Sequence, residues 1–153
     1  MANLATLSRA TAALLAAMCL AGCGTMGDGA LTMSSGPSEI PPAAAAAIAG
    51  DMVGRLSERI GPARPTVQLK TDGSPFSQAL QSSLKSWGYG VVTDGQAQTG
   101  PTITLAYVVE PMDGQYLARL STSDFDLGRF YRVTTAGAAP SSPLSVLERG
   151  QMS

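Results

Sequence analysis

The residue best suited to a covalent reaction is Cys23, which follows Leu20, Ala21 and Gly22 at the end of an apolar segment. A cysteine placed in this way is typical of bacterial lipoproteins, in which the thiol carries a diacylglyceryl group. Cleavage would follow Gly22, and the freed amine of Cys23 would take a third acyl chain. Each buried methylene contributes about 0.8 kcal/mol, so three chains would anchor the protein firmly in a membrane. We therefore expect lipidation at Cys23 and signal cleavage between Gly22 and Cys23.

The residues before this cysteine have the pattern of a secretory signal. Arg9 supplies a positive charge, and the run from Ala10 to Leu20 contains Thr11 as its one polar residue. The run has roughly half of the 20 apolar residues that a membrane-spanning helix needs. A buried or incidental cysteine after an ordinary signal is the less favoured alternative. Residue 24 is Gly rather than the Asp that commonly retains proteobacterial lipoproteins at the inner membrane, so we expect an outer-membrane anchor and a domain in the periplasm.

Other residues that could perform chemistry are few. The chain has no histidine, which removes histidine general bases and histidine metal ligands. A serine nucleophile would then need a lysine partner, and the chain has only two lysines, Lys70 and Lys85. Asp113, Asp124 and Asp126 lack the spacing of a calcium-binding loop. We therefore expect no catalytic residue, no cofactor and no metal site, and a protein that is not an enzyme.

The composition excludes further classes of protein. The 10 Lys and Arg residues nearly balance 11 Asp and Glu, and both signs are interspersed, whereas a nucleic-acid-binding protein would show a basic patch or stripe. We expect no direct contact with nucleic acid. Removal of 22 signal residues from 153 leaves 131, enough for one small domain with a tail. Cys19 would leave with the signal, so the mature chain would contain no disulfide.

Two amphipathic helices are expected in the folded part. The first covers residues 43–60, because Pro41-Pro42 favours a helix start and Gly61-Pro62 a stop. Its apolar stripe consists of Ile48, Met52, Leu56 and Ile60, and the opposite face, with Asp51, Arg55, Glu58 and Arg59, is expected to be solvated.

The second helix would begin at Pro75 after a cap provided by Asp72 or Ser74. It would end at Gly88, which fits the left-handed residue found after many helices. Its apolar stripe consists of Phe76, Leu80, Leu84 and Trp87. We expect Trp87 and Tyr89 to pack in the core rather than form an exposed recognition surface.

The other regular segments alternate as strands. They cover residues 66–70, 89–93, 102–110, 115–121 and 125–135. Asp113-Gly114 predicts a hairpin turn between the third and fourth of them. This order predicts an α+β fold, with two helices packed on one face of a small, mostly antiparallel sheet.

These assignments divide the chain into four parts. They are a lipoprotein signal peptide at residues 1–22, the lipidated cysteine and a flexible tether at 23–42, an α+β domain at 43–135 and a tail rich in Pro, Ser and Ala at 136–153. The tail would be disordered or would dock back on its own domain. A sharper hypothesis is that its small apolar group, Leu144, Val146 and Leu147, docks on a neighbouring subunit.

Taken together, these segments resemble the TrbH family of conjugal-transfer lipoproteins. The likeness is carried by LAGC at residues 20–23, IAGDM at 48–52 with Arg55 and Leu56, WGYGVVTDG at 87–95, LARLS at 117–121, Gly128 and Arg129 with Tyr131, and AGAAPSSPLS at 136–145. No single segment is chemically diagnostic, so the resemblance depends on the series and its order.

The resemblance implies a subunit of the mating-pair-formation apparatus, a type IV secretion system that moves plasmid DNA with its bound relaxase. It implies a structural or assembly role for a lipid-anchored protein beside TrbG-like and TrbI-like subunits of the outer-membrane core. The membrane contact would be made by the acyl chains on Cys23.

Two other classes stay open. One is a regulatory or assembly lipoprotein that reaches across the periplasm to a cell-wall or outer-membrane enzyme. The other is a small periplasmic hydrolase or ligand-binding protein, which a deep pocket with convergent polar groups would favour.

Overall fold

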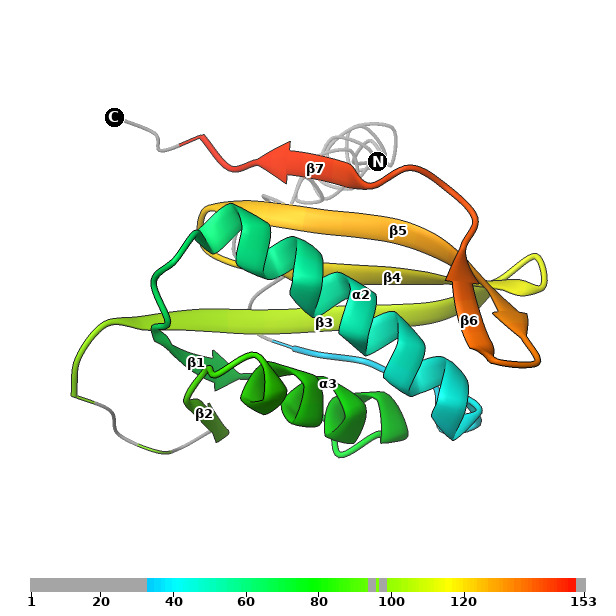
Figure 1. Ribbon diagram of the computed structural model, residues 1–153, viewed down its shortest axis with the longest axis horizontal. Coiled ribbons are helices and arrows are strands. Elements are labelled where there is room, and N and C mark those ends of the chain that lie inside the picture. The colour runs from blue at the N-terminus through cyan, green and yellow to red at the C-terminus, as the bar shows by residue number, and fades with distance from the viewer. Residues whose placement is uncertain (1–32, 94–95, 97–98, 151–153) are drawn as a thin grey trace, which may run out of the picture.

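Two helices cover one face of a mixed sheet in the computed structural model, which describes residues 33–93, 96 and 99–150 (Figure 1). The expected signal peptide with Gly22, the lipidation site Cys23 and residues 24–32 of the expected tether lie outside the described residues. The helices are α2 (Pro42–Ile60) and α3 (Pro75–Ser86). The strands are β1 (Thr66–Leu69), β2 (Val91–Thr93), β3 (Thr102–Met112), β4 (Gln115–Ser121), β5 (Phe125–Thr134), β6 (Gly137–Pro140) and β7 (Ser145–Glu148).

The sheet has the order β2-β1-β3-β4-β5-β6, and β7 also pairs with β5. β1 runs parallel to both of its neighbours, β2 and β3. The pairs from β3 through β6, and the pair of β5 with β7, are antiparallel. The expected α+β fold, with two helices on one face of a mostly antiparallel sheet, is therefore confirmed.

The helix ends follow the local sequence. Pro42 occupies the first turn of α2, where its missing N–H costs no hydrogen bond. At the start of α3, the Ser74 side chain accepts a hydrogen bond from the Ser77 N–H at 3.2 Å, so Ser74 is the cap. Gly88 follows α3 with a φ of 85°, as the sequence predicts.

The core lies between the helices and the inner face of the sheet, which we define as the face that the helices cover. Alternation places Leu105, Tyr107 and Val109 of β3 on this face, where all three are buried. Asp113 and Gly114, both with positive φ, form the expected turn that joins β3 to β4. The buried helix side chains that meet these strands are Ala44, Ala45, Ile48, Ala49, Met52, Val53, Leu56, Phe76, Leu80 and Leu84.

Trp87 is not a core residue, and this expectation was wrong. Tyr89 is 3% exposed, as expected, but Trp87 is 44% exposed. Trp87 follows the last turn of α3 as its C-cap and lies over Gly54 of α2, where a Cβ would come within 3.5 Å of the indole ring. The ring therefore covers a glycine at the surface instead of entering the sheet–helix interface.

Candidate docking surface

The C-terminal segment is built into the sheet. The expected domain boundary at residue 135 differs from the structure, because β6 and β7 continue the sheet to Glu148 (Figure 1). Both strands pair with the same edge of β5, β6 near its end and β7 near its start. Of the two expectations for the tail, a disordered end or one that docks on its own domain, the described residues show the second.

A short interruption separates β6 from β7. From Pro140, opposite Tyr131, to Ser145, opposite Gly128, the chain has two residues more than β5 has over the same distance. The residues between β6 and β7 are still hydrogen-bonded to β5. The Ser141 N–H donates to the Phe130 carbonyl at 2.8 Å, and the Phe130 N–H donates to Ser142 Oγ at 3.0 Å. An insertion of two residues preserves the alternation of side chains, so β7 presents the same faces as an uninterrupted strand would.

The three residues expected to dock on a partner take different positions. Leu144 is partly buried and packs against the core. Val146 is 39% exposed and lies opposite Leu127, whereas Leu147 is 63% exposed and lies opposite Asp126. Successive strand residues point to opposite faces, so the side chains of Val146 and Leu147 lie on opposite faces of the sheet. Among the described residues β7 pairs with β5 alone, which leaves its other edge open.

Charged contacts hold β7 in place. Arg149 Nη2 lies 2.7 Å from Asp126 Oδ1, and the Arg149 N–H donates to the Asp124 carbonyl at 2.8 Å. Arg59 of α2 forms an ion pair with Glu148 and lies 5.7 Å from the centre of the Phe125 ring. The Asp126 carboxylate is therefore engaged by an arginine, and the described residues contain no cluster of three or more metal-ligating side chains.

A second set of contacts joins β5 and the segment between β6 and β7 to helix α2. Asp51 Oδ2 accepts hydrogen bonds from the Tyr131 hydroxyl at 2.6 Å and from Arg129 Nη1 at 3.0 Å, and Arg129 Nε donates to the Ser142 carbonyl at 3.0 Å. Burial, and then the hydrogen bond to Asp51, raise the pKa of Tyr131. Asp51 was expected on a solvated face, which was wrong, because its carboxylate joins α2 to β5. Arg55 and Glu58 do form an exposed pair, at 2.9 Å.

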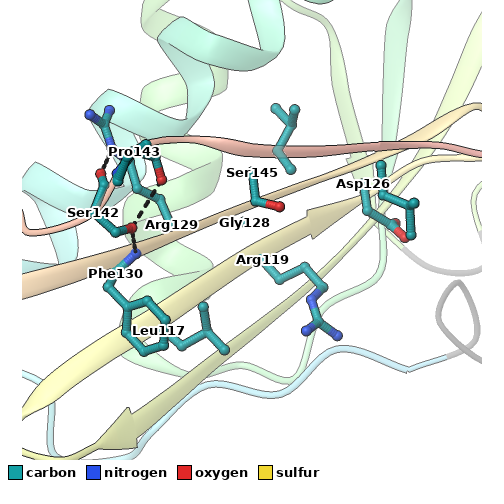
Figure 2. Close-up of a pocket in the computed structure, with 11 residues that line it drawn as sticks. Leu117, Arg119, Asp126, Gly128, Arg129, Phe130, Ser142, Pro143 and Ser145 are labelled. Atoms are coloured by element: carbon teal, nitrogen blue, oxygen red, sulfur yellow. Dashed lines mark hydrogen bonds between the residues drawn. The ribbon is translucent and has the colours of Figure 1, made fainter.

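A groove of about 530 Å³ lies beside β7 on the outer face, the sheet face opposite the helices (Figure 2). The side chains of Leu117, Arg119 and Phe130 project to the same side of the β4–β5 pair there. Arg119 is exposed and forms no ion pair or hydrogen bond with another described residue. The groove is completed by Asp126, Leu127, Gly128, Arg129, Ser142, Pro143, Ser145 and Leu147.

The segment before α2, where a flexible tether was expected, pairs with β3. Ser35 forms a bridge to Val108, with its N–H donating to the Tyr107 carbonyl at 3.0 Å and its carbonyl accepting from the Val109 N–H at 2.8 Å. The Gly36 N–H donates to Asp72 Oδ2 at 2.7 Å. The described part of the expected tether, residues 33–42, is thus held by β3 and by the loop before α3.

Asp72 is the acceptor at the centre of this attachment. Its carboxylate accepts hydrogen bonds from the Tyr107 hydroxyl, the Ser74 N–H and the Gly36 N–H. Partial burial opposes ionisation of Asp72, but hydrogen bonds from Tyr107, Ser74 and Gly36 outweigh burial and lower its pKa below 3.8. The ionised form of Asp72 therefore stabilises the fold.

The sequence comparisons cover nearly the whole of the described domain. A sequence profile described as conjugal transfer protein TrbH matches residues 25–150, which include both helices and all the strands described above. The chain belongs to the TrbH family. A relative named probable conjugal transfer protein TrbH, from Sinorhizobium fredii (strain NBRC 101917 / NGR234), is 50% identical over 135 residues, which cover 85% of this chain and 90% of the relative. No solved structure matches the chain.

Membership of the TrbH family makes this chain a component of a conjugative transfer system. The matched region ends at residue 150, so it includes β6, β7 and the groove. Neither of the described helices has the length and apolar character needed to span a membrane.

The contact between Arg129 and Asp51 was not predicted from the sequence. Arg129 lies two residues from both Leu127 and Tyr131, and these two are buried on the inner face. Strict alternation along residues 127–131 would have placed Arg129 there as well and raised the question of its partner. Asp51 lies 78 positions before Arg129, so no local sequence pattern connects the two residues.

Proposed function

We propose that this TrbH-family protein is a lipid-anchored outer-membrane component of the conjugative type IV secretion apparatus, with a structural or assembly role. Acyl chains on Cys23 would hold it in the outer membrane, with its domain in the periplasm. Its partners would be the TrbG-like and TrbI-like subunits of the outer-membrane core. Family membership supports the conjugative setting, and the lipoprotein sequence at residues 20–23 supports the anchor.

The open edge of β7 is the observation that carries the docking role. An edge strand presents unpaired N–H and C=O groups, and an extended segment of another subunit can add to it as a further strand. Val146 and Leu147 would contact that segment from the two faces, whereas Leu144 is committed to the core. The charged contacts at Glu148 and Arg149 keep this edge in a fixed conformation, which lowers the entropic cost of binding.

The groove does not favour a hydrolase or ligand-binding role. Two of its charged side chains, Asp126 and Arg129, are engaged in ion pairs with Arg149 and Asp51. Much of the remaining lining is apolar, and no pair of titratable groups in it is arranged as nucleophile and base.

Copurification tests the docking role directly. The lipidated protein, carried with its transfer genes, would be isolated from outer-membrane extracts and its bound subunits identified. Leu147→Asp should reduce recovery of the TrbG-like and TrbI-like subunits and lower transfer frequency, because it places a charge on the open edge. Met112→Asp, which changes another exposed apolar side chain at the β3–β4 hairpin, is the matched control. Unchanged recovery with Leu147→Asp would remove β7 as the docking edge.

Anchoring needs its own test. Cys23→Ser should leave an uncleaved or soluble protein and abolish transfer. Transfer at the wild-type frequency in the presence of this variant would mean that lipid anchoring is not needed for the function.

A further inference from the structure

One row of residues crosses the outer face from the N-terminal segment to β7. Ser35 bridges Val108, Val108 pairs with Arg119, Arg119 with Gly128, and Gly128 with Ser145. Neighbouring strands lie about 4.8 Å apart, so Ser35 is about 10 Å from Arg119. The point at which the described chain begins is therefore close to the groove, on the same sheet.

Arg119 is the one charged side chain in the groove that has no ion-pair partner among the described residues. Asp126 is engaged by Arg149, and the Arg129 guanidinium bonds Asp51 on the inner face. Arg119 is exposed beside Leu117 and Phe130, two apolar side chains that line the same groove (Figure 2). This arrangement fits an extended segment that carries one carboxylate between apolar side chains.

The chain itself contains such a segment just before the described residues. Met26, Asp28 and Leu31 lie in the short stretch that would join the lipidated cysteine to the domain, and Asp28 is the one acidic residue among the first 32. Asp28 precedes Ser35 by seven positions, that is, by seven Cα–Cα steps along the chain. Fully extended, these seven steps span about 23 Å, more than twice the distance from Ser35 to Arg119.

We propose that residues 26–31 bind the outer-face groove, with the Asp28 carboxylate paired to the Arg119 guanidinium and with Met26 and Leu31 against Leu117 and Phe130. The proposal does not depend on the conjugative role, since it concerns one chain alone. In a protein lipidated at Cys23, it would leave Gly24 and Thr25 as the free link to the acyl chains. The outer face of the sheet would then lie close to the membrane surface.

Disulfide crosslinking in the lipidated protein tests this docking. Gly27→Cys and Leu117→Cys together place one thiol in the segment and one in the groove, and the mature chain has no other free thiol if Cys23 is lipidated. Oxidation should produce an intramolecular disulfide. Adding Arg119→Glu should lower its yield about two- to fivefold, the range expected for an exposed ion pair. Adding Asp28→Lys to Arg119→Glu should restore the yield. Salt near 1 M should reduce the yield in the protein that carries only the two cysteine substitutions.

Arg132→Glu is the matched control, because Arg132 is an exposed arginine on the neighbouring strand β5 outside the groove. It should leave the crosslinking yield unchanged, and the melting temperatures should show that all variants are folded. Three results would overturn the proposal: no crosslink, a crosslink insensitive to Arg119→Glu, or crosslinked dimers, which would make a second copy the occupant. Purified protein is used throughout, so a negative result leaves the conjugative role untouched, and a transfer defect leaves this measurement untouched.

Discussion

The Tyr131 hydroxyl donates a 2.6 Å hydrogen bond to Asp51, joining β5 to α2 across 80 residues of sequence. Arg129 donates to the same carboxylate oxygen and also to the Ser142 carbonyl. One carboxylate therefore connects the first helix, the fifth strand and the segment that leads to the docking edge. We expect this network to determine both the stability of the domain and the position of β7.

Tyr131→Phe should lower the free energy of unfolding by about 1–2 kcal/mol, because it leaves a partly buried carboxylate with one partner fewer. Tyr89→Phe is a matched control. The Tyr89 hydroxyl is buried and has no hydrogen-bond partner among the described residues, so its removal should be neutral or slightly stabilising. Urea denaturation of both variants measures the difference. Equal losses would mean that the bond to Asp51 adds nothing to stability.

The same tyrosine should make the fold sensitive to alkali. The pKa of Tyr131 is raised above 10 in the folded state by burial and by the bond to Asp51. Its contribution is therefore complete below pH 10 and is lost as the pH rises above that value, since the unfolded chain releases the proton first. The free energy of unfolding, measured from pH 8 to pH 11, should fall less steeply in Tyr131→Phe than in the parent protein. Parallel profiles would contradict this assignment.

Asp72 should produce the opposite dependence in acid. Its folded-state pKa is lowered below 3.8, so its contribution is present above that pH and is lost as the pH falls through the folded value. Asp72→Asn should lower stability at pH 7 and should flatten the decline between pH 4 and pH 2. Asp113→Asn, at an exposed turn, is the control and should follow the parent profile. A decline in Asp72→Asn as steep as that of the parent would assign the acid sensitivity to other carboxylates.

Arg129→Ala should destabilise the domain by about 1.5–3 kcal/mol, since it removes two hydrogen bonds, one of them to a carboxylate. It should also release the segment before β7, so amide hydrogen exchange at Val146 and Leu147 should increase more than exchange at Leu120 in β4. Arg132→Ala, on an exposed position of the same strand, should change stability by no more than about 0.5 kcal/mol. Uniform exchange changes across the sheet would show that Arg129 does not position β7 specifically.

The parts of the fold that the sequence predicts are those with local signals. Both helices have a 3.6-residue apolar period and begin with proline, and α3 ends at a glycine with positive φ. β3 and β4 alternate cleanly and are joined by Asp113-Gly114, the strongest short hairpin signal. These features depend on neighbours within a few residues, which is why sequence patterns reveal them.

β6 and β7 could not be predicted in the same way. The β6 sequence, Gly137 to Pro140, has the composition of a loop, and proline is excluded from central strands. It forms a strand here because it lies at the sheet edge and pairs with β5, a contact set by the tertiary fold. The groove shares this origin, since it combines side chains from β4 and β5 with others from the segment between β6 and β7 and from β7.

Gly137 gives the most specific prediction about that edge. Its φ is 133°, and a Cβ there would lie 2.6 Å from the Ala43 carbonyl oxygen in the first turn of α2, a backbone atom that cannot move without displacing the helix. Gly137→Ala should therefore lower the free energy of unfolding by about 2–4 kcal/mol. Gly88→Ala is the comparison, because Gly88 also has positive φ but a Cβ there would have no neighbour within 4 Å. It should cost about 1 kcal/mol from backbone strain alone. Equal losses of unfolding free energy in the two variants would mean that β6 is not in close contact with α2. A larger loss for Gly137→Ala would show that this contact holds the edge of the sheet against α2.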